Sequence, residues 1–132
     1  MTVFVDTSAF LSVLDADDAF HSVADRIWTE LIEQAEDLFC TSYVLVESFA
    51  LVQNRLGIAA VRTLVEDVLP VIRVHWVRSE EHQEGVSALL TTGRRKLSLV
   101  DCVSFQSMRR FGVSDAFTFD QDFVEQGFRV LR

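Results

Sequence analysis

The stretch Thr2–Ala9, TVFVDTSA, is a short apolar run that ends in an acid and passes at once into hydroxyl residues. Its β-branched and aromatic residues predict a buried strand over residues 2–6. Thr7 or Ser8 can cap a helix that begins directly afterwards. The stretch therefore predicts a strand followed by a helix, with Asp6 at the junction between them.

The rest of the chain repeats this alternation of strand and helix. Ser42 can cap a helix, Pro70 ends one, and glycines mark the ends of others. Further helices are expected over residues 19–36, 43–56, 58–69, 79–92 and 99–111. Further strands are expected over residues 37–41, 71–77, 116–119 and 128–131. This order predicts a three-layer α/β/α sandwich with a central, mainly parallel sheet, formed by one domain over residues 1–132.

The composition restricts the function classes. At 132 residues and 49% hydrophobic content the chain can bury a substantial core. The start of the chain lacks the features of a signal peptide, and no apolar stretch approaches the roughly 18 residues of a membrane span. Cys40 and Cys102 form no motif, so a reduced, cytoplasmic setting is expected. The net charge of −8 disfavours nonspecific nucleic-acid binding but does not exclude a nuclease with an acidic metal site.

Four acids, Asp6, Glu47, Asp101 and Asp120, stand at or inside apolar segments. An unpaired charge in apolar surroundings costs several kcal/mol, so such acids normally have a partner or bind a metal. The chain has only one lysine, Lys96, and few basic residues lie near these acids in sequence. A divalent cation with oxygen ligands is therefore the leading candidate for neutralising them.

The expected positions of the four acids differ, and some have a purely structural alternative. Asp6 and Asp120 end strands, where open α/β sheets bind ligands, but Asp6 could cap a helix and Asp120 could be a turn residue. Asp101 lies in a first helical turn, and Ser98-x-x-Asp101 fits a capping box. Glu47 is expected on an apolar helical face, buried and in need of a partner. Converging carboxylates would suit two Mg²⁺ or Mn²⁺ ions about 3.5–4 Å apart in phosphodiester cleavage.

These residues, in this order, resemble the PIN-domain nucleases, most closely the VapC-type toxins of type II toxin–antitoxin pairs. The matching segments are VDTSA at residues 5–9, Glu47 within a helix, LSLVD at 97–101, and TFDxDF at 118–123. The resemblance covers essentially the whole chain and includes its length and its alternating architecture. It implies a Mg²⁺- or Mn²⁺-dependent endoribonuclease that is inhibited by a small cognate antitoxin and commonly forms a homodimer.

The resemblance also implies roles for individual residues. Asp6, Asp101 and Asp120 would hold metal, and Glu47 would ligate a metal or position the attacking water. Asp122 matches an auxiliary acid that varies within the family. The supporting hydroxyl positions of the family are matched by Thr7, Ser8 and Thr118. Hydrolysis by metal-activated water would leave a 5′-phosphate and a 3′-hydroxyl.

The basic loop Arg94-Arg95-Lys96 precedes the helix that carries Asp101, so it could bind RNA phosphates beside the site. A solvated basic loop without such a role is the alternative. Two other acidic-pocket folds fit poorly. A receiver domain needs a lysine after a late strand, and a haloacid-dehalogenase-type phosphatase needs an acid where Ser8 stands. A non-catalytic module for dimerisation or antitoxin binding remains open, with its apolar groove on the helices near 19–69.

Overall fold

The computed structural model describes all residues from 1 to 132, and its centre is a sheet of five strands. The strands are β1 (Thr2–Val5), β2 (Asp37–Thr41), β3 (Ile72–His75), β4 (Asp115–Phe117) and β5 (Arg129–Val130). Their order is β3-β2-β1-β4-β5, and every neighbouring pair is parallel. The predicted parallel sheet is confirmed.

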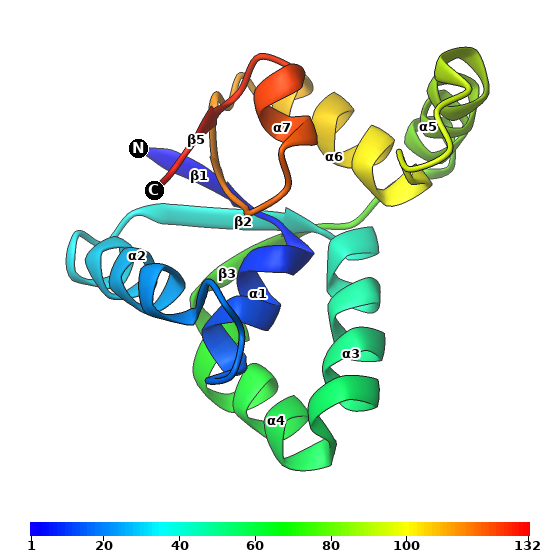
Figure 1. The fold of residues 1–132 in the computed structure, drawn as a ribbon. Coiled ribbons are helices and arrows are strands. Elements are labelled where there is room, and N and C mark those ends of the chain that lie inside the picture. The colour runs from blue at the N-terminus through cyan, green and yellow to red at the C-terminus, as the bar shows by residue number, and fades with distance from the viewer.

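Helices cover both faces of this sheet (Figure 1). One layer contains α1 (Thr7–Leu14), α2 (His21–Glu33), α3 (Ser42–Leu56) and α4 (Ile58–Thr63). The opposite layer contains α5 (Ser79–Thr92), α6 (Leu99–Arg110) and the short α7 (Asp122–Glu125). The three-layer α/β/α arrangement is therefore confirmed. None of these helices combines the length and apolarity that a membrane crossing requires.

The core lies between the sheet and the two helical layers, and phenylalanines fill much of it. Phe4 on β1 contacts Phe39 on β2 edge to face at 5.2 Å and stacks on Phe123 of α7 at 6.0 Å between ring centroids. Phe4, Phe39 and Phe123 are completely buried. Such aromatic pairs add to the stabilisation from burial at the centre of the sheet. This centre is where β1 and β4 lie side by side.

The strand order fixes where a ligand site can form. From β1 the chain builds β2 and β3 on one side, and it later adds β4 and β5 on the other. The sheet therefore has its topological switch point between β1 and β4, where helices leave in different directions and a crevice opens at the carboxyl ends. Asp6 follows β1 directly, and its backbone N–H donates to the Phe117 carbonyl at the end of β4 at 3.0 Å.

Several predicted boundaries were wrong. Ser42 does not cap α3: Thr41 does, accepting from the Val44 N–H, while the Ser42 hydroxyl accepts from the Val77 N–H. The helix expected over 58–69 breaks into α4, a π-helical turn over Leu64–Val68 and a 3₁₀ turn over Leu69–Val71. The helix expected over 19–36 and the strands over 71–77, 116–119 and 128–131 begin or end elsewhere. The helix α7 was not predicted.

Candidate active site

Asp6 is the most buried acid of the crevice, with 5% of its surface exposed. It occupies the N-cap position of α1, but its side chain makes no capping hydrogen bond. Instead, its Oδ2 accepts hydrogen bonds from the Ser8 and Thr118 hydroxyls, each at 2.9 Å. Burial raises the pKa of Asp6, while these two hydrogen bonds oppose the rise. Asp6 therefore occupies the N-cap position that was predicted for Thr7 or Ser8, but its side chain does not act as a cap.

The hydroxyls of Ser8 and Thr118 hold Asp6 against the loop that follows β4. The Phe119 N–H donates to Ser8 Oγ at 2.9 Å, and the Asp120 N–H donates to Thr118 Oγ1 at 3.0 Å. Each hydroxyl thus accepts from the backbone and donates its own proton to Asp6. This relay fixes the position of Asp120 relative to Asp6, although 114 positions separate them in sequence.

Asp101 reaches the crevice from the first turn of α6. The predicted capping box is present, because the Asp101 N–H donates to Ser98 Oγ and Asp101 Oδ2 accepts from the Ser98 N–H, both at 3.1 Å. Capping alone would lower the pKa of Asp101, but the pKa is raised. Burial raises the pKa of Asp101, and the charges of Asp6 and Asp120 add to the rise, while the hydrogen bonds with Ser98 oppose it. The resulting pKa is about 6. Asp101 is therefore both a cap and a strongly perturbed acid of the kind found at functional sites.

Asp120 and Asp122 complete an acidic trio with Asp101. Asp120 Oδ1 accepts from the Asp122 N–H at 2.9 Å, so Asp120 is also the turn residue that begins the approach to α7. One carboxylate oxygen from each of Asp101, Asp120 and Asp122 lies within 4.8 Å of the others. Burial and the charge of Asp120 raise the pKa of Asp122. These three residues are called the acidic trio below.

All four acids singled out from the sequence line one hollow of about 280 Å³. Asp6 enters from the end of β1, Glu47 from α3, Asp101 from α6 and Asp120 from the loop after β4. The rest of the lining is contributed by Thr7, Ser8, Leu11, Leu51, Lys96 and Ser98. Glu47 is only half-buried, contrary to the expectation, because its helical face opens on the hollow rather than on the core.

Two wall residues of the hollow, Leu11 and Leu51, were missed. The sequence did contain a signal for them: Leu11 lies four positions after Thr7, and Leu51 lies four positions after Glu47, each on the same helix as its predicted site residue. Residues at that spacing share a helical face.

The basic loop lies beside these acids. Lys96 is exposed and lines the hollow, and Arg95 is exposed on the same loop. Arg94 makes ion pairs with Asp122 at 3.7 Å and with Glu125 at 3.3 Å. The structure therefore places Lys96 in the lining of the hollow and Arg94 directly against a member of the acidic trio, whereas Arg95 only shares their loop.

The donor chemistry of this site fits a hard divalent cation. Its ligands would be carboxylate oxygens, which Mg²⁺ and Mn²⁺ prefer, and the trio has the short mutual spacing that one ion needs. Burial raises the pKa values of Asp6, Asp101 and Asp122, and the charge of Asp120 raises each of them further, so the ionised forms of these carboxylates are costly here. A bound cation would remove this cost.

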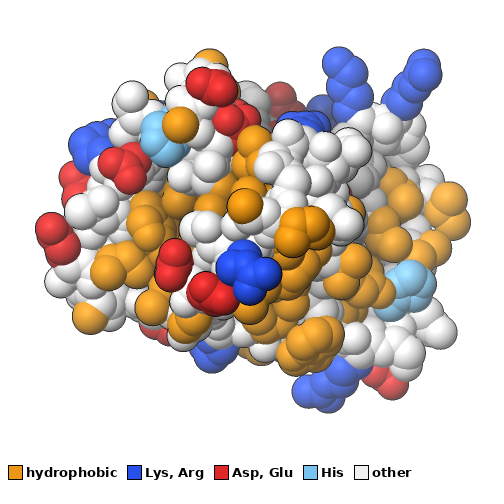
Figure 2. All heavy atoms as spheres, turned by 90° about the horizontal axis from the view of Figure 1, so that it is seen from below, with side chains coloured by type: hydrophobic (Ala, Val, Ile, Leu, Met, Phe, Trp, Pro, Cys, Tyr) orange, Lys and Arg blue, Asp and Glu red, His pale blue; other side chains and the backbone are white.

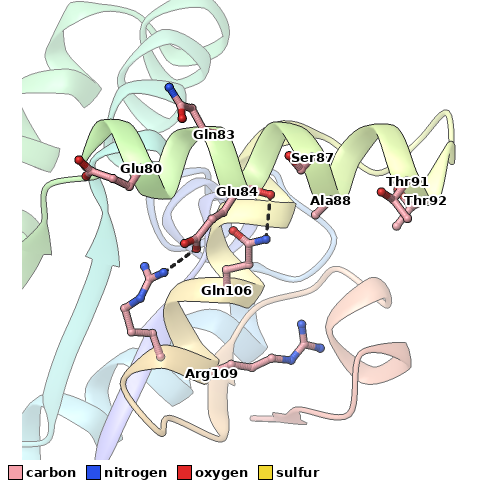
Figure 3. A pocket seen from close by; sticks show the side chains of 10 residues that line it. Glu80, Gln83, Glu84, Ser87, Ala88, Thr91, Thr92, Gln106 and Arg109 are labelled. Carbon is pink, nitrogen blue, oxygen red and sulfur yellow. Dashed lines mark hydrogen bonds and ion pairs between the residues drawn. The ribbon is translucent and has the colours of Figure 1, made fainter.

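A second, larger hollow of about 1080 Å³ lies between α5 and α6 (Figure 3). Two interactions cross it: Glu84 accepts from Arg110 at 2.6 Å, and Gln106 donates to the Glu84 carbonyl at 3.1 Å. None of the four predicted acids lines it. The hollow at the carboxyl ends of β1 and β4 is therefore the candidate active site.

Comparison with known proteins identifies the family of this chain. The family model described as PIN domain matches residues 3–129. The chain is 33% identical to the 23S rRNA-specific endonuclease VapC20 of Mycobacterium tuberculosis. The aligned region of 131 residues covers 98% of each of the two proteins.

Solved structures agree on the fold. The crystal structure of M. tuberculosis VapC20, described as a Sarcin-Ricin loop cleaving toxin, superimposes with a TM-score of 0.83 at 32% identity, covering 96% of this chain and 95% of that one. FitAcB from Neisseria gonorrhoeae, at 16% identity and covering 100% and 97% of the two chains, shares the fold with a TM-score of 0.71. The family model and the VapC20 relative together show that this chain belongs to the PIN domain family.

Proposed function

We propose that this protein is a divalent-metal-dependent endoribonuclease that acts as the toxin of a toxin–antitoxin pair. The observation that carries the proposal is the convergence of Asp6, Glu47, Asp101 and Asp120, from four separate elements, on one hollow. A structural role for each acid alone would not bring all four together. The relation to VapC20, an endonuclease specific for 23S rRNA, supports RNA as the substrate class.

The chain's own residues would divide the work as follows. Asp6, Asp101, Asp120 and Asp122 would hold Mg²⁺ or Mn²⁺, which lowers the pKa of bound water and stabilises negative charge on phosphate oxygens. Asp6 is kept in position by Ser8 and Thr118. Thr7 supports this arrangement from behind, because Ser48 Oγ donates to its hydroxyl at 3.5 Å.

Glu47 lines the same hollow as the other three acids and can accept a proton from the attacking water. Lys96, in the same lining, can contact a phosphate oxygen of the RNA, as can Arg95 from the rim. No side chain of the hollow is arranged as an activated nucleophile, which favours direct attack by water. The products would carry a 5′-phosphate and a 3′-hydroxyl.

The test is to replace Asp6 with Asn in purified protein freed of any partner. We expect RNA cleavage to fall at least about 100-fold, because Asn keeps the hydrogen-bonding shape but lacks the charge that holds the cation. Asp25→Asn, at an exposed position of α2, is the matched control and should retain activity. Intact 23S rRNA is the first substrate to use, and mapping the ends of the products identifies the cut. Full activity of the Asp6 variant would refute the assignment, and cleavage that persists in EDTA would indicate a contaminating ribonuclease.

The partner of such a toxin would be a small antitoxin protein. Apolar side chains gather on the face that α4 and the ends of α1 and α3 form (Figure 2). The exposed apolar residues of these helices and their neighbours include Val23, Ile58 and Val65. We assign this face to the antitoxin, because an exposed apolar patch of this kind is typical of a protein contact. Homodimer formation is a separate part of the proposal, which the molar mass in solution tests.

A further inference from the structure

Arg94 is the only basic residue that makes an ion pair with the acidic trio. Its Nη2 lies 3.7 Å from Asp122 Oδ1 and 3.3 Å from Glu125 Oε2, and both acids belong to α7. The Asp122 side chain is 21% exposed, whereas Arg94 is 53% exposed and can leave the contact without unfolding anything. Arg94 also follows Gly93, which ends α5 with a φ of +59°. The guanidinium thus sits on a short loop at the edge of the site.

A divalent cation held by the trio would disturb this ion pair. The cation would bind the Asp122 carboxylate, whose Oδ1 now lies against Arg94, and its double charge would repel the guanidinium at a separation of a few ångströms. Arg94 would keep Glu125 as a partner, but this pair is solvent-exposed on both sides and therefore weak. Metal and Arg94 therefore compete for the same carboxylate.

We propose that Arg94 is a built-in counter-ion of the acidic trio, which the metal displaces, and that the displaced guanidinium then contacts a phosphate of the RNA. A guanidinium binds phosphate oxygens in a paired geometry, so it is suited to this second role. The inference rests on the proposed nuclease function and adds an order to it: metal binding prepares one of the RNA contacts. The structure distinguishes Arg94 from its neighbour Arg95, which makes no ion pair with the trio.

The competition is tested by titrating Mn²⁺ into the protein without RNA, by calorimetry. Arg94→Gln should bind Mn²⁺ about two- to five-fold more tightly than the wild type, as expected for removal of a competing surface charge. Arg95→Gln is the matched control, because it changes the net charge by the same amount from the adjacent position. The gain should shrink as ionic strength rises. If Arg94→Gln binds Mn²⁺ no more tightly than Arg95→Gln, the competition is refuted.

The second step is tested by RNA binding in a Glu47→Gln background, which retains the trio and is expected not to cleave. The probe is a short single-stranded RNA oligonucleotide, titrated at several salt concentrations with and without Mn²⁺. With Mn²⁺ present, Arg94→Gln should reduce the slope of log affinity against log salt by about 0.7, which corresponds to one phosphate contact. Without Mn²⁺ it should leave the slope unchanged. If Arg94→Gln reduces the salt slope equally with and without Mn²⁺, the proposal that metal binding releases Arg94 to the RNA is refuted.

Asp120→Asn separates this inference from the proposed function. The nuclease proposal requires that this variant lose Mn²⁺ binding. If Asp120→Asn binds Mn²⁺ as the wild type does, the proposed function itself fails. If it loses Mn²⁺ binding while Arg94→Gln behaves like Arg95→Gln, the metal site stands and only the role of Arg94 is refuted.

Discussion

Asp101 has two opposite effects on the stability of the folded protein. Its carboxylate caps α6 through Ser98, which favours the ionised form near the helix N-terminus. Burial together with the charges of Asp6 and Asp120 nevertheless raises its pKa to about 6. Above pH 6 the metal-free protein therefore holds an ionised Asp101 at a cost that the unfolded chain does not have.

Asp101→Asn should stabilise the metal-free protein at pH 7.5 by about 1–2 kcal/mol, a value reduced for the partial exposure of the site. The folded pKa lies above the ordinary value of 3.8, so the cost of the charge is present above pH 6 and disappears as the pH falls toward 4. The gain from Asn should therefore shrink at pH 5. Denaturant unfolding in EDTA at both pH values measures it, and a loss of stability at pH 7.5 would contradict the argument.

At the scale of elements, α5 and α6 pack against each other unusually closely at Gly85. A Cβ placed on Gly85 would lie 2.6 Å from Val103 Cγ2 and 3.3 Å from Leu99 Cδ1. Both contacts are with α6, the helix whose first turn carries Asp101. Gly85 thus sets the distance between α5 and α6, and α6 in turn places Asp101.

Gly85→Ala should destabilise the protein by about 1–3 kcal/mol because of this overlap. The sign is informative, since alanine is the better helix former by about 1 kcal/mol and would stabilise an open position. Thermal unfolding in EDTA provides the measurement. Ser87→Ala, on the exposed side of the same helix, is the control and should be neutral or slightly stabilising. A Gly85→Ala protein as stable as the wild type would show that α5 moves away freely.

Glu81 connects three elements through one buried carboxylate. It is 7% exposed on α5, and its Oε2 lies 2.8 Å from His75 Nε2 on β3 and 2.6 Å from Arg110 Nη1 on α6. Burial acts to raise the pKa of Glu81, but the hydrogen bonds from His75 and from the Arg78 N–H, with the charges of His75 and Arg110, lower it overall.

Glu81→Gln should cost about 1–3 kcal/mol at pH 7, because it leaves Arg110 without its buried partner. Because the pKa of Glu81 is lower in the folded protein than in the unfolded chain, its charge contributes to the free energy of unfolding. This contribution is complete above pH 4.5 and is lost as the pH falls through the pKa of the folded state. The difference between wild type and variant should therefore narrow in acid. Urea unfolding at pH 7 and pH 3.5 measures it, with the exposed Glu80→Gln as control. A constant difference at both pH values would rule out the charge as the cause.

The elements that could be predicted are those whose pattern is local. The apolar run before Asp6 and the capping box at Ser98 each contain their own signal, so the start of α6 was placed correctly and β1, predicted over residues 2–6, ends one residue earlier at Val5. Thr41 and Ser42 are both good caps, and the choice between them depends on Val77, which is 35 positions away. The break after α4 depends on packing of Leu64 and Val68 into the core, which no local pattern contains.

The same limit applies to the candidate site. Asp6 and Asp101 could be located because each lies at the end or the start of a predictable element, and Asp120 because it follows the predicted late strand, although β4 ends earlier, at Phe117. The exposure of Glu47 and the contact of Arg94 with Asp122 could not, since they arise where α3, α7 and the basic loop meet in space. Their roles, like those of all the site residues, stay predictions until the variants are measured.

At the scale of the whole molecule, the acidic site opposes stability. The chain carries 20 acidic and 12 basic residues, and part of the excess is concentrated at the switch point of the sheet. Asp6 at the end of β1, Asp101 on α6 and Asp122 on α7 all have pKa values raised by burial and, in addition, by the charge of Asp120. The fold holds them together through packing of the sheet and helices, so it is least stable when no cation is bound.

A divalent cation should consequently stabilise the folded protein as a whole. Binding to the folded state alone contributes about 2.7 kcal/mol at a concentration 100 times the Kd, which corresponds to a rise in Tm of about 10 °C for a chain of this length. We expect Mn²⁺ or Mg²⁺ to produce such a rise in 0.15 M salt, and EDTA to reverse it. Asp120→Asn should abolish the rise, whereas the exposed-site variant Asp25→Asn should keep it. An equal rise in Tm for both variants would mean that the cation binds elsewhere on the acidic surface. The acidic trio would then not be the metal site.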